Sequence, residues 1–154
     1  MSDHVTPRRI VPAMNGVYDS LGQYAWPSIR VATGLLAMPH GAQKLFGVWG
    51  GNFQNYVGFF QKMGFEPAAA MVYLVGITEF FGGLCLAIGF LTRVWAAGLF
   101  ILMTVAWYGV HLRNGLFWTQ GGIEFPLLWS LLCLAFFIRG GGEYSVDRRL
   151  GKEF

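Results

Sequence analysis

The stretch PAAAMVYLVGITEFFGGLCLAIGFL, from Pro67 to Leu91, decides the fold class of this 154-residue chain. Its 25 residues contain one charged side chain, Glu79. A helix that crosses a lipid bilayer needs about 20 predominantly apolar residues. Val94 to Leu112 is a second run, of 19 residues, with no charge other than the one that His111 can carry. Two such runs in succession predict an integral membrane protein.

The composition of the whole chain supports this prediction. Only 12% of the residues are charged, 55% are hydrophobic and the mean hydropathy is +0.47, whereas a soluble domain carries about 25% charged residues. These values argue against a soluble domain and against a disordered chain. The net charge of +3 does not indicate a nucleic-acid partner, because the bases are split between chain ends and loops. The polar Met1–Pro12 segment has no apolar core, so we expect no cleaved signal.

We expect one all-α domain, residues 1–154, built as an integral membrane four-helix bundle with short interfacial amphipathic helices. The amphipathic segments are Met14–Tyr24 and Phe53–Phe60, which place apolar residues at helical spacing. In the first span, Trp26 is predicted to anchor the membrane interface and Pro27 to occupy the first helical turn. The expected spans are about residues 26–46, 67–91, 93–113 and 124–139, with cytoplasmic tails at 1–25 and 140–154.

Basic residues are unevenly distributed between the two sides that four spans would create. One side holds seven bases: Arg8, Arg9, Arg93, Arg139, Arg148, Arg149 and Lys152. The other side holds three: Lys44, Lys62 and Arg113. Because cytoplasmic loops carry an excess of Lys and Arg, we expect a multi-pass protein of a bacterial inner membrane with both termini in the cytoplasm. Arg93, in the short connection between spans two and three, and Trp26 are expected to be structural or interface residues.

Several ionisable residues lie inside the expected spans, and such residues are candidate functional sites. With a rise of about 1.5 Å per residue, His40, Glu79 and Glu124 lie about 21, 18 and 22 Å above the cytoplasmic ends of their helices. His111, at about 27 Å, and Lys44 lie just above this layer. Arg30, about 6 Å above its helix end, is expected to extend toward the inner headgroups as a structural residue.

This polar layer has more than one reading. Its members can pair with one another only to hold helices together, or they can bind a polar ligand, a quinone headgroup or protons. A haem held by His40 and His111, or a metal held by both histidines and a carboxylate, are further alternatives. We predict that the side chains of His40 and Glu79 lie within hydrogen-bond reach or one water apart, with Glu124 or His111 adjacent. Small residues recur in spans one and two and are expected to permit close helix approach: Ala37, Gly41, Gly76, Gly82, Gly83 and Gly89.

The sequence resembles the DoxX family of small four-helix membrane proteins over about Arg30–Leu150. The matching pieces are Arg30 with Gly34, HGAQKLFG from His40, GFEP from Gly64, EFFGGLCLAIGFLTR from Glu79, Met103, Ala106 and His111 before GLF at Gly115, EFPLL from Glu124, and GGGEYSVD from Gly140. His40, Glu79, His111 and Glu124 all fall in these pieces. The resemblance implies association with quinone-linked oxidoreductases, including a thiosulfate:quinone oxidoreductase, and with membrane complexes for redox stress.

From these observations we expect a subunit of a larger redox complex, serving as an anchor or as a quinone-adjacent piece. The alternative is a stand-alone membrane carrier or a ligand- or metal-binding protein that uses the same layer. Catalysis by the chain alone is the least expected, because no nucleophile–base pair, metal-binding spacing or nucleotide loop is present. We expect lipids and either protein partners or further copies of the chain around it. No covalently bound cofactor is expected, and quinone is the cofactor that the resemblance implies.

Overall fold

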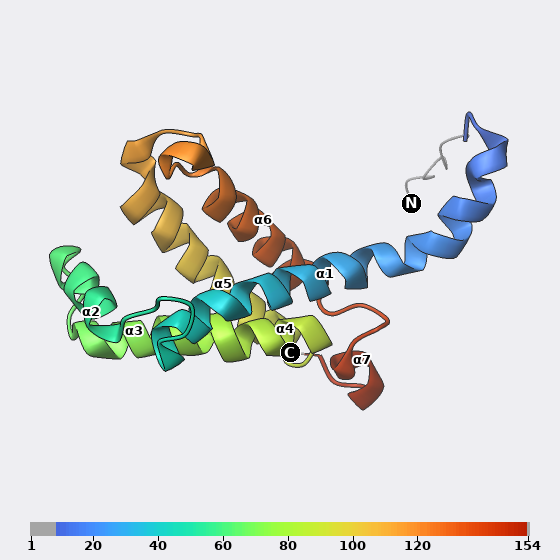
Figure 1. Cartoon of the computed structure of the whole chain (residues 1–154). Coiled ribbons are helices and arrows are strands. Elements are labelled where there is room, and N and C mark those ends of the chain that lie inside the picture. Colours follow the sequence, from blue (N-terminus) through green and yellow to red (C-terminus); the bar gives the residue numbers. More distant parts are fainter. Residues whose placement is uncertain (1–8, 154) are drawn as a thin grey trace.

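The computed structural model describes residues 9–153, which are helical throughout with short connections and contain no strand (Figure 1). Two continuous helices, Ala68–Ile88 and Thr92–Asn114, are long and apolar enough to cross a membrane. The all-α, membrane-type character predicted from the sequence is therefore confirmed. The α-helices are α1 (Asn15–Phe46), α2 (Phe53–Lys62), α3 (Ala68–Ile77), α4 (Gly83–Ile88), α5 (Thr92–Val105), α6 (Glu124–Arg139) and α7 (Val146–Leu150).

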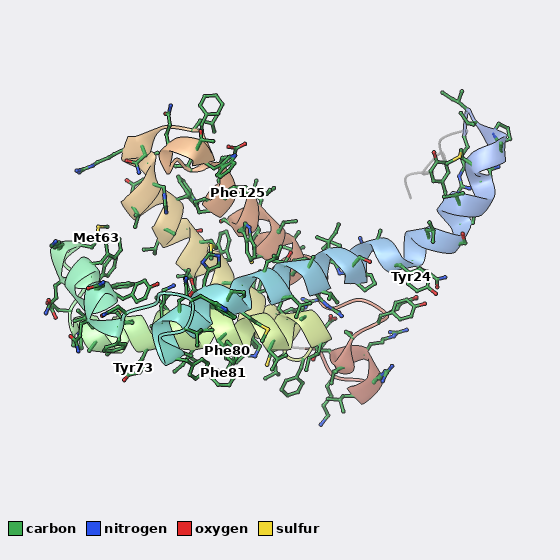
Figure 2. All side chains as sticks on the ribbon, in the orientation of Figure 1. Tyr24, Met63, Tyr73, Phe80, Phe81 and Phe125 are labelled. Carbon is green, nitrogen blue, oxygen red and sulfur yellow. The ribbon has the colours of Figure 1, made fainter. Side chains whose placement is uncertain are left out.

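Helix α1 is one continuous helix of 32 residues, where the sequence suggested an interfacial helix followed by a separate span. Pro27 lies well inside this helix and not in its first turn. A proline inside a helix removes one backbone hydrogen bond and bends the helix without having to end it. Figure 1 shows that the N-terminal part of α1 bends away from the other helices, and Figure 2 places Tyr24 near the bend.

Helix α1 packs against the continuous helix made by α3, the π-helical segment η2 (Thr78–Gly82) and α4. The contact is between backbones. A Cβ atom added at Gly34 would lie 2.6 Å from the backbone nitrogen of Ala87, and one added at Gly83 would lie 2.7 Å from the Gly34 carbonyl oxygen. Gly41 likewise faces the backbone of Phe80. The prediction that small residues permit close helix approach is confirmed for this pair.

A second antiparallel pair consists of α5, continued by the π-helical segment η3 (Ala106–His111), and α6. A hydrogen bond of 3.1 Å joins the hydroxyls of Thr104 and Ser130 across this pair. Toward the turn that connects them, α5 and α6 diverge from α1 and α3 (Figure 1). The buried core lies at the opposite end and is formed by Ala37, Leu86, Ala96, Leu99, Cys133 and Phe136. The molecule therefore consists of two helix pairs that share a core at one end.

The short helix α2 connects the two helices of the first pair. We call this end of the molecule the outer end and the opposite end, where α7 lies, the inner end. Its first turn is capped by the Asn52 side chain, which accepts a hydrogen bond of 3.1 Å from the backbone nitrogen of Asn55. The ring of Phe53 packs against Tyr73 of α3, with 4.8 Å between the ring centroids. The amphipathic segment expected at Phe53–Phe60 is therefore helical, and it lies against α3.

The close contact between α1 and α4 gives a stability prediction. Gly34→Ala forces the two backbones apart, so we expect a loss of about 1–3 kcal/mol of folding free energy, as overpacking a tight interface causes. Gly22→Ala, in the same helix, meets nothing within 4 Å, and we expect it to be neutral or slightly stabilising. Unfolding of both variants in detergent micelles measures the difference. Equal stability of the two variants would contradict the contact.

Candidate functional site

The outer part of the first helix pair contains a mostly buried ion pair. The Nζ atom of Lys44 lies 2.7 Å from Oε2 of Glu79, and their side chains are 13% and 7% exposed. Lys44 also donates a hydrogen bond of 3.2 Å to the His40 carbonyl oxygen. Its ammonium lies 5.2 Å from the centroid of the Tyr56 ring, a cation–π contact from α2. We name Lys44, Glu79, His40 and Tyr56 the outer polar site.

The backbone around Glu79 explains how this carboxylate reaches α1. Glu79 lies in η2, whose five residues form one π-helical turn between α3 and α4. Such wide turns shift the face that a helix presents and are frequent at functional sites. Gly41 of α1 has no side chain, so the segment around Phe80 approaches α1 closely. The Lys44 side chain, one turn farther along α1, then meets the carboxylate of Glu79.

Glu79 therefore pairs with Lys44, where the sequence analysis paired it with His40. His40 lies one helical turn before Lys44 and its side chain is exposed. Lys44 has the longer side chain and ends in an ammonium group, so it is the stronger partner for a carboxylate removed from water. The spacing of His40 and Lys44 already indicated that both residues lie on one helix face, because residues four apart do so. The depth estimate placed Lys44 above the layer because it measured the position of the backbone and not the reach of the side chain.

His111 and Glu124 belong to a different part of the molecule, the turn between η3 and α6. The Nδ1 atom of His111 lies 2.6 Å from the Gly121 carbonyl oxygen, and Glu124 accepts a hydrogen bond of 3.1 Å from the Trp118 backbone nitrogen. Figure 2 labels Phe125 and Phe80, the neighbours of Glu124 and Glu79, and the two are well separated. The expected layer thus divides into two groups, because its helix pairs diverge at this end.

This division affects the haem and metal alternatives that the sequence left open. Both require His40 and His111 to face one another, and the structure places these residues in separate groups. Within residues 9–153, no three histidine, cysteine, aspartate or glutamate side chains come together in a way that could hold a metal ion.

At the opposite, inner end of the helices, Arg30 is almost completely buried, with 1% of its surface exposed. Its guanidinium donates hydrogen bonds to the carbonyl oxygens of Gly141 and Tyr144, the latter at 2.7 Å, and more weakly to Ala87 at 3.4 Å. The expectation that Arg30 extends toward the headgroups is therefore wrong. The C-terminal segment supplies carbonyl groups to the guanidinium, so the arginine does not need to reach water.

Asp147 holds the same C-terminal segment to the turn between α4 and α5. Its carboxylate oxygens accept hydrogen bonds of 2.7 and 2.9 Å from the backbone nitrogens of Leu91 and Thr92, and its own backbone nitrogen donates to Gly89 at 2.9 Å. A carboxylate at a helix N-terminus is favoured by the helix dipole. We name Arg30, Asp147 and the segment from Gly140 to Ser145 the inner clasp. The GGGEYSVD motif contains most of this clasp, although the sequence predicted only a tail over residues 140–154.

Trp26 and Arg93 also bind the C-terminal part of the chain. The indole nitrogen of Trp26 donates a hydrogen bond of 3.0 Å to the Gly140 carbonyl oxygen, and the Arg139 guanidinium lies 4.7 Å from the Trp26 ring centroid. Arg93 forms an ion pair of 3.3 Å with Glu153. Both residues therefore contact other parts of the chain at the inner end.

Comparison with known proteins identifies the family of the chain. The family model described as DoxX matches residues 25–112. The chain belongs to the DoxX family. The matched region contains Arg30, His40, Lys44, Glu79 and His111, and it ends before Glu124 and the C-terminal part of the inner clasp.

Two curated relatives are uncharacterized proteins of Haemophilus influenzae. The first is 35% identical over 69 residues, which cover 45% of this chain and 46% of the relative. The second is 33% identical over 86 residues, which cover 54% of this chain and 64% of the relative. The matches thus span less than two thirds of either relative. No solved structure matches the chain.

The ion pair of the outer polar site gives a second stability prediction. Lys44→Met leaves the Glu79 carboxylate buried without a cation, and we expect a loss of about 3 kcal/mol. The double variant Lys44→Met/Glu79→Leu replaces the pair by apolar groups and should recover most of that loss. Lys62→Met, which changes an exposed lysine, is the matched control and should leave stability unchanged. The measurement is denaturant unfolding in micelles, and a stable Lys44→Met single variant would refute the coupling.

Proposed function

We propose that this DoxX-family protein is a four-pass membrane subunit of a quinone-linked redox complex, and that its outer polar site receives the quinone headgroup. The observation that carries the proposal is the Lys44–Glu79 ion pair. Taking two charges out of water costs several kcal/mol per ion, and ionisable residues inside membrane helices are usually functional. This pair lies between two helices that also approach each other closely at glycine residues.

The residue types of the outer polar site fit a quinone headgroup. The Lys44 ammonium can donate a hydrogen bond to a quinone carbonyl oxygen, and the Glu79 carboxylate can accept the proton of a quinol hydroxyl. The Tyr56 ring adds an aromatic face next to the ammonium. In this proposal a partner subunit supplies the electrons that reduce the quinone or accepts those of the quinol, and this chain contributes no redox centre. The chain thereby binds, orients and exchanges protons with the quinone.

The four-pass topology rests on helix lengths and on charge. At about 1.5 Å per residue, the 32-residue α1 is long enough to cross the bilayer and continue beyond it. Helix α6 has 16 residues and extends about 24 Å, so its N-terminal turn would lie inside the outer headgroup layer. The inner end is the more basic one, which favours cytoplasmic termini in a bacterial inner membrane.

Binding of a photoreactive ubiquinone analogue tests the function. We expect about tenfold weaker labelling in Glu79→Gln, because an amide cannot accept the proton and the charge-assisted contact is lost. The Lys44→Met/Glu79→Leu double variant should also lose labelling while staying folded. Glu124→Gln makes the same chemical change in the other group and should label like the unchanged protein.

Equal labelling of Glu79→Gln and Glu124→Gln would refute a quinone site at the ion pair and leave an anchoring role. Purification in a mild detergent tests the partner separately. A stoichiometric oxidoreductase that copurifies supports the subunit role. A chain that purifies alone with bound quinone would contradict that role and support a stand-alone carrier.

Cysteine labelling in intact cells tests the topology. Gln54→Cys in α2 and Arg149→Cys in α7 place exposed thiols at opposite ends of the molecule. An impermeant maleimide added from outside should label the first variant and spare the second until the cells are permeabilised. The unchanged protein, whose Cys85 and Cys133 lie within the helices, gives the background. Similar labelling of both variants from outside would exclude the four-pass arrangement.

A further inference from the structure

A charged cavity of about 430 Å³ lies at the inner end of the molecule, away from the outer polar site. It is enclosed by the C-terminal end of α6, the inner clasp and α7. Its charged lining consists of three bases and three acids: Arg139, Arg148, Lys152, Glu143, Asp147 and Glu153. Neither the family match nor the proposed quinone site gives this cavity a role.

The bases and the acids of the cavity differ in whether their charged groups already have partners. Both carboxylate oxygens of Asp147 already accept hydrogen bonds from the start of α5. Glu153 is bound by Arg93 and by the Gly141 backbone nitrogen. Among the described residues, Arg139, Arg148 and Lys152 form no ion pair. Three cations thus line the cavity, and Glu143 is the one lining carboxylate that has no hydrogen bond among these residues.

The cavity is held in shape by the buried groups of the inner clasp. Arg30 binds the carbonyl oxygens of Gly141 and Tyr144, on either side of Gly142 and Glu143. Ser145 accepts a hydrogen bond of 3.1 Å from the Arg148 backbone nitrogen, which fixes the start of α7. The bases therefore project from a fixed backbone, so an anion that binds there does not have to order the segment.

An apolar groove lies next to this cavity, along the side of α1. It is shallow and largely open, and it is lined by Tyr24, Pro27, Val31, Leu35 and Tyr144. Tyr144 lines the groove, and its sequence neighbours Glu143 and Ser145 line the charged cavity. A molecule with an apolar chain and a phosphate group could therefore place one part in each. A phospholipid has both an apolar chain and a phosphate group. Inorganic phosphate has the anionic group alone.

We infer that the inner cavity binds the phosphate group of an anionic phospholipid, with an acyl chain of that lipid in the groove along α1. Arg139, Arg148 and Lys152 supply the positive charge, as basic pockets between membrane helices do for anionic lipids. Trp26, against which Arg139 packs, is of the residue type that lies at the headgroup level. The inference is independent of the Lys44–Glu79 site and of the quinone proposal.

Native mass spectrometry of the full chain in a neutral detergent tests the inference. Phosphatidylglycerol is titrated into the unchanged protein and into Arg148→Gln/Lys152→Gln, and we expect about twentyfold weaker binding in the double variant. The double variant Arg113→Gln/Arg149→Gln is the matched control, because it also removes two positive charges, at exposed residues that do not line the cavity. This control should bind the lipid as the unchanged protein does. A melting curve without lipid checks that all variants are folded.

Two further arms separate the sources of the phosphate group. Phosphatidylcholine, whose headgroup is neutral overall, should bind at least tenfold more weakly than phosphatidylglycerol. Inorganic phosphate should compete only at millimolar concentration, since it does not use the groove. Binding of inorganic phosphate as tight as that of the lipid would overturn the lipid assignment. An equal loss in Arg113→Gln/Arg149→Gln and in Arg148→Gln/Lys152→Gln would overturn the site, because binding would then follow net charge alone.

Discussion

The direct backbone contact between α1 and α4 is the constraint on which the other features depend. Gly34 and Gly83 have no side chains at the crossing, so the two helices approach more closely than larger residues would allow. This approach fixes where the two basic side chains of α1, Arg30 and Lys44, can reach. Lys44 meets Glu79 on one side of the crossing, and Arg30 meets the inner clasp on the other. A wider separation would leave both charges without their partners in an apolar environment.

The buried charges of Arg30 and Lys44, both in α1, are stabilised in different ways. At the outer end, a lysine and a carboxylate neutralise each other, and the lysine remains 13% exposed. At the inner end, backbone carbonyl oxygens surround the Arg30 guanidinium, and the nearby Asp147 carboxylate is used to cap α5. A carboxylate can exchange a proton with a ligand, whereas a peptide carbonyl cannot. This difference is the reason for assigning chemistry to the outer end and structural and lipid-binding roles to the inner end.

The sequence predicts the features that depend on local apolar pattern and fails for those that depend on distant contacts. The bounds of α6, Glu124–Arg139, agree with the predicted span, because Pro126 and Gly140 mark its ends locally. The continuity of α1 through Pro27 was missed, since a proline permits either a helix start or a bend. The Asp147 cap was also missed, because its partners at Leu91 and Thr92 lie more than 50 residues away. The similar depths estimated for His40, Glu79 and Glu124 predicted one polar layer. A depth along the helix axis does not report the lateral distance between two helices.

The inner clasp has a consequence for the order in which the protein is made. Arg30 and its acceptor at Gly141 are 111 residues apart. At the usual rate of synthesis, roughly ten seconds separate the appearance of the arginine from that of its acceptors. During that interval the guanidinium lacks the carbonyl groups of Gly141 and Tyr144, and α4 offers only the long contact of 3.4 Å with Ala87. The arginine therefore has to stay near water, or be shielded by the insertion machinery, until translation has almost finished.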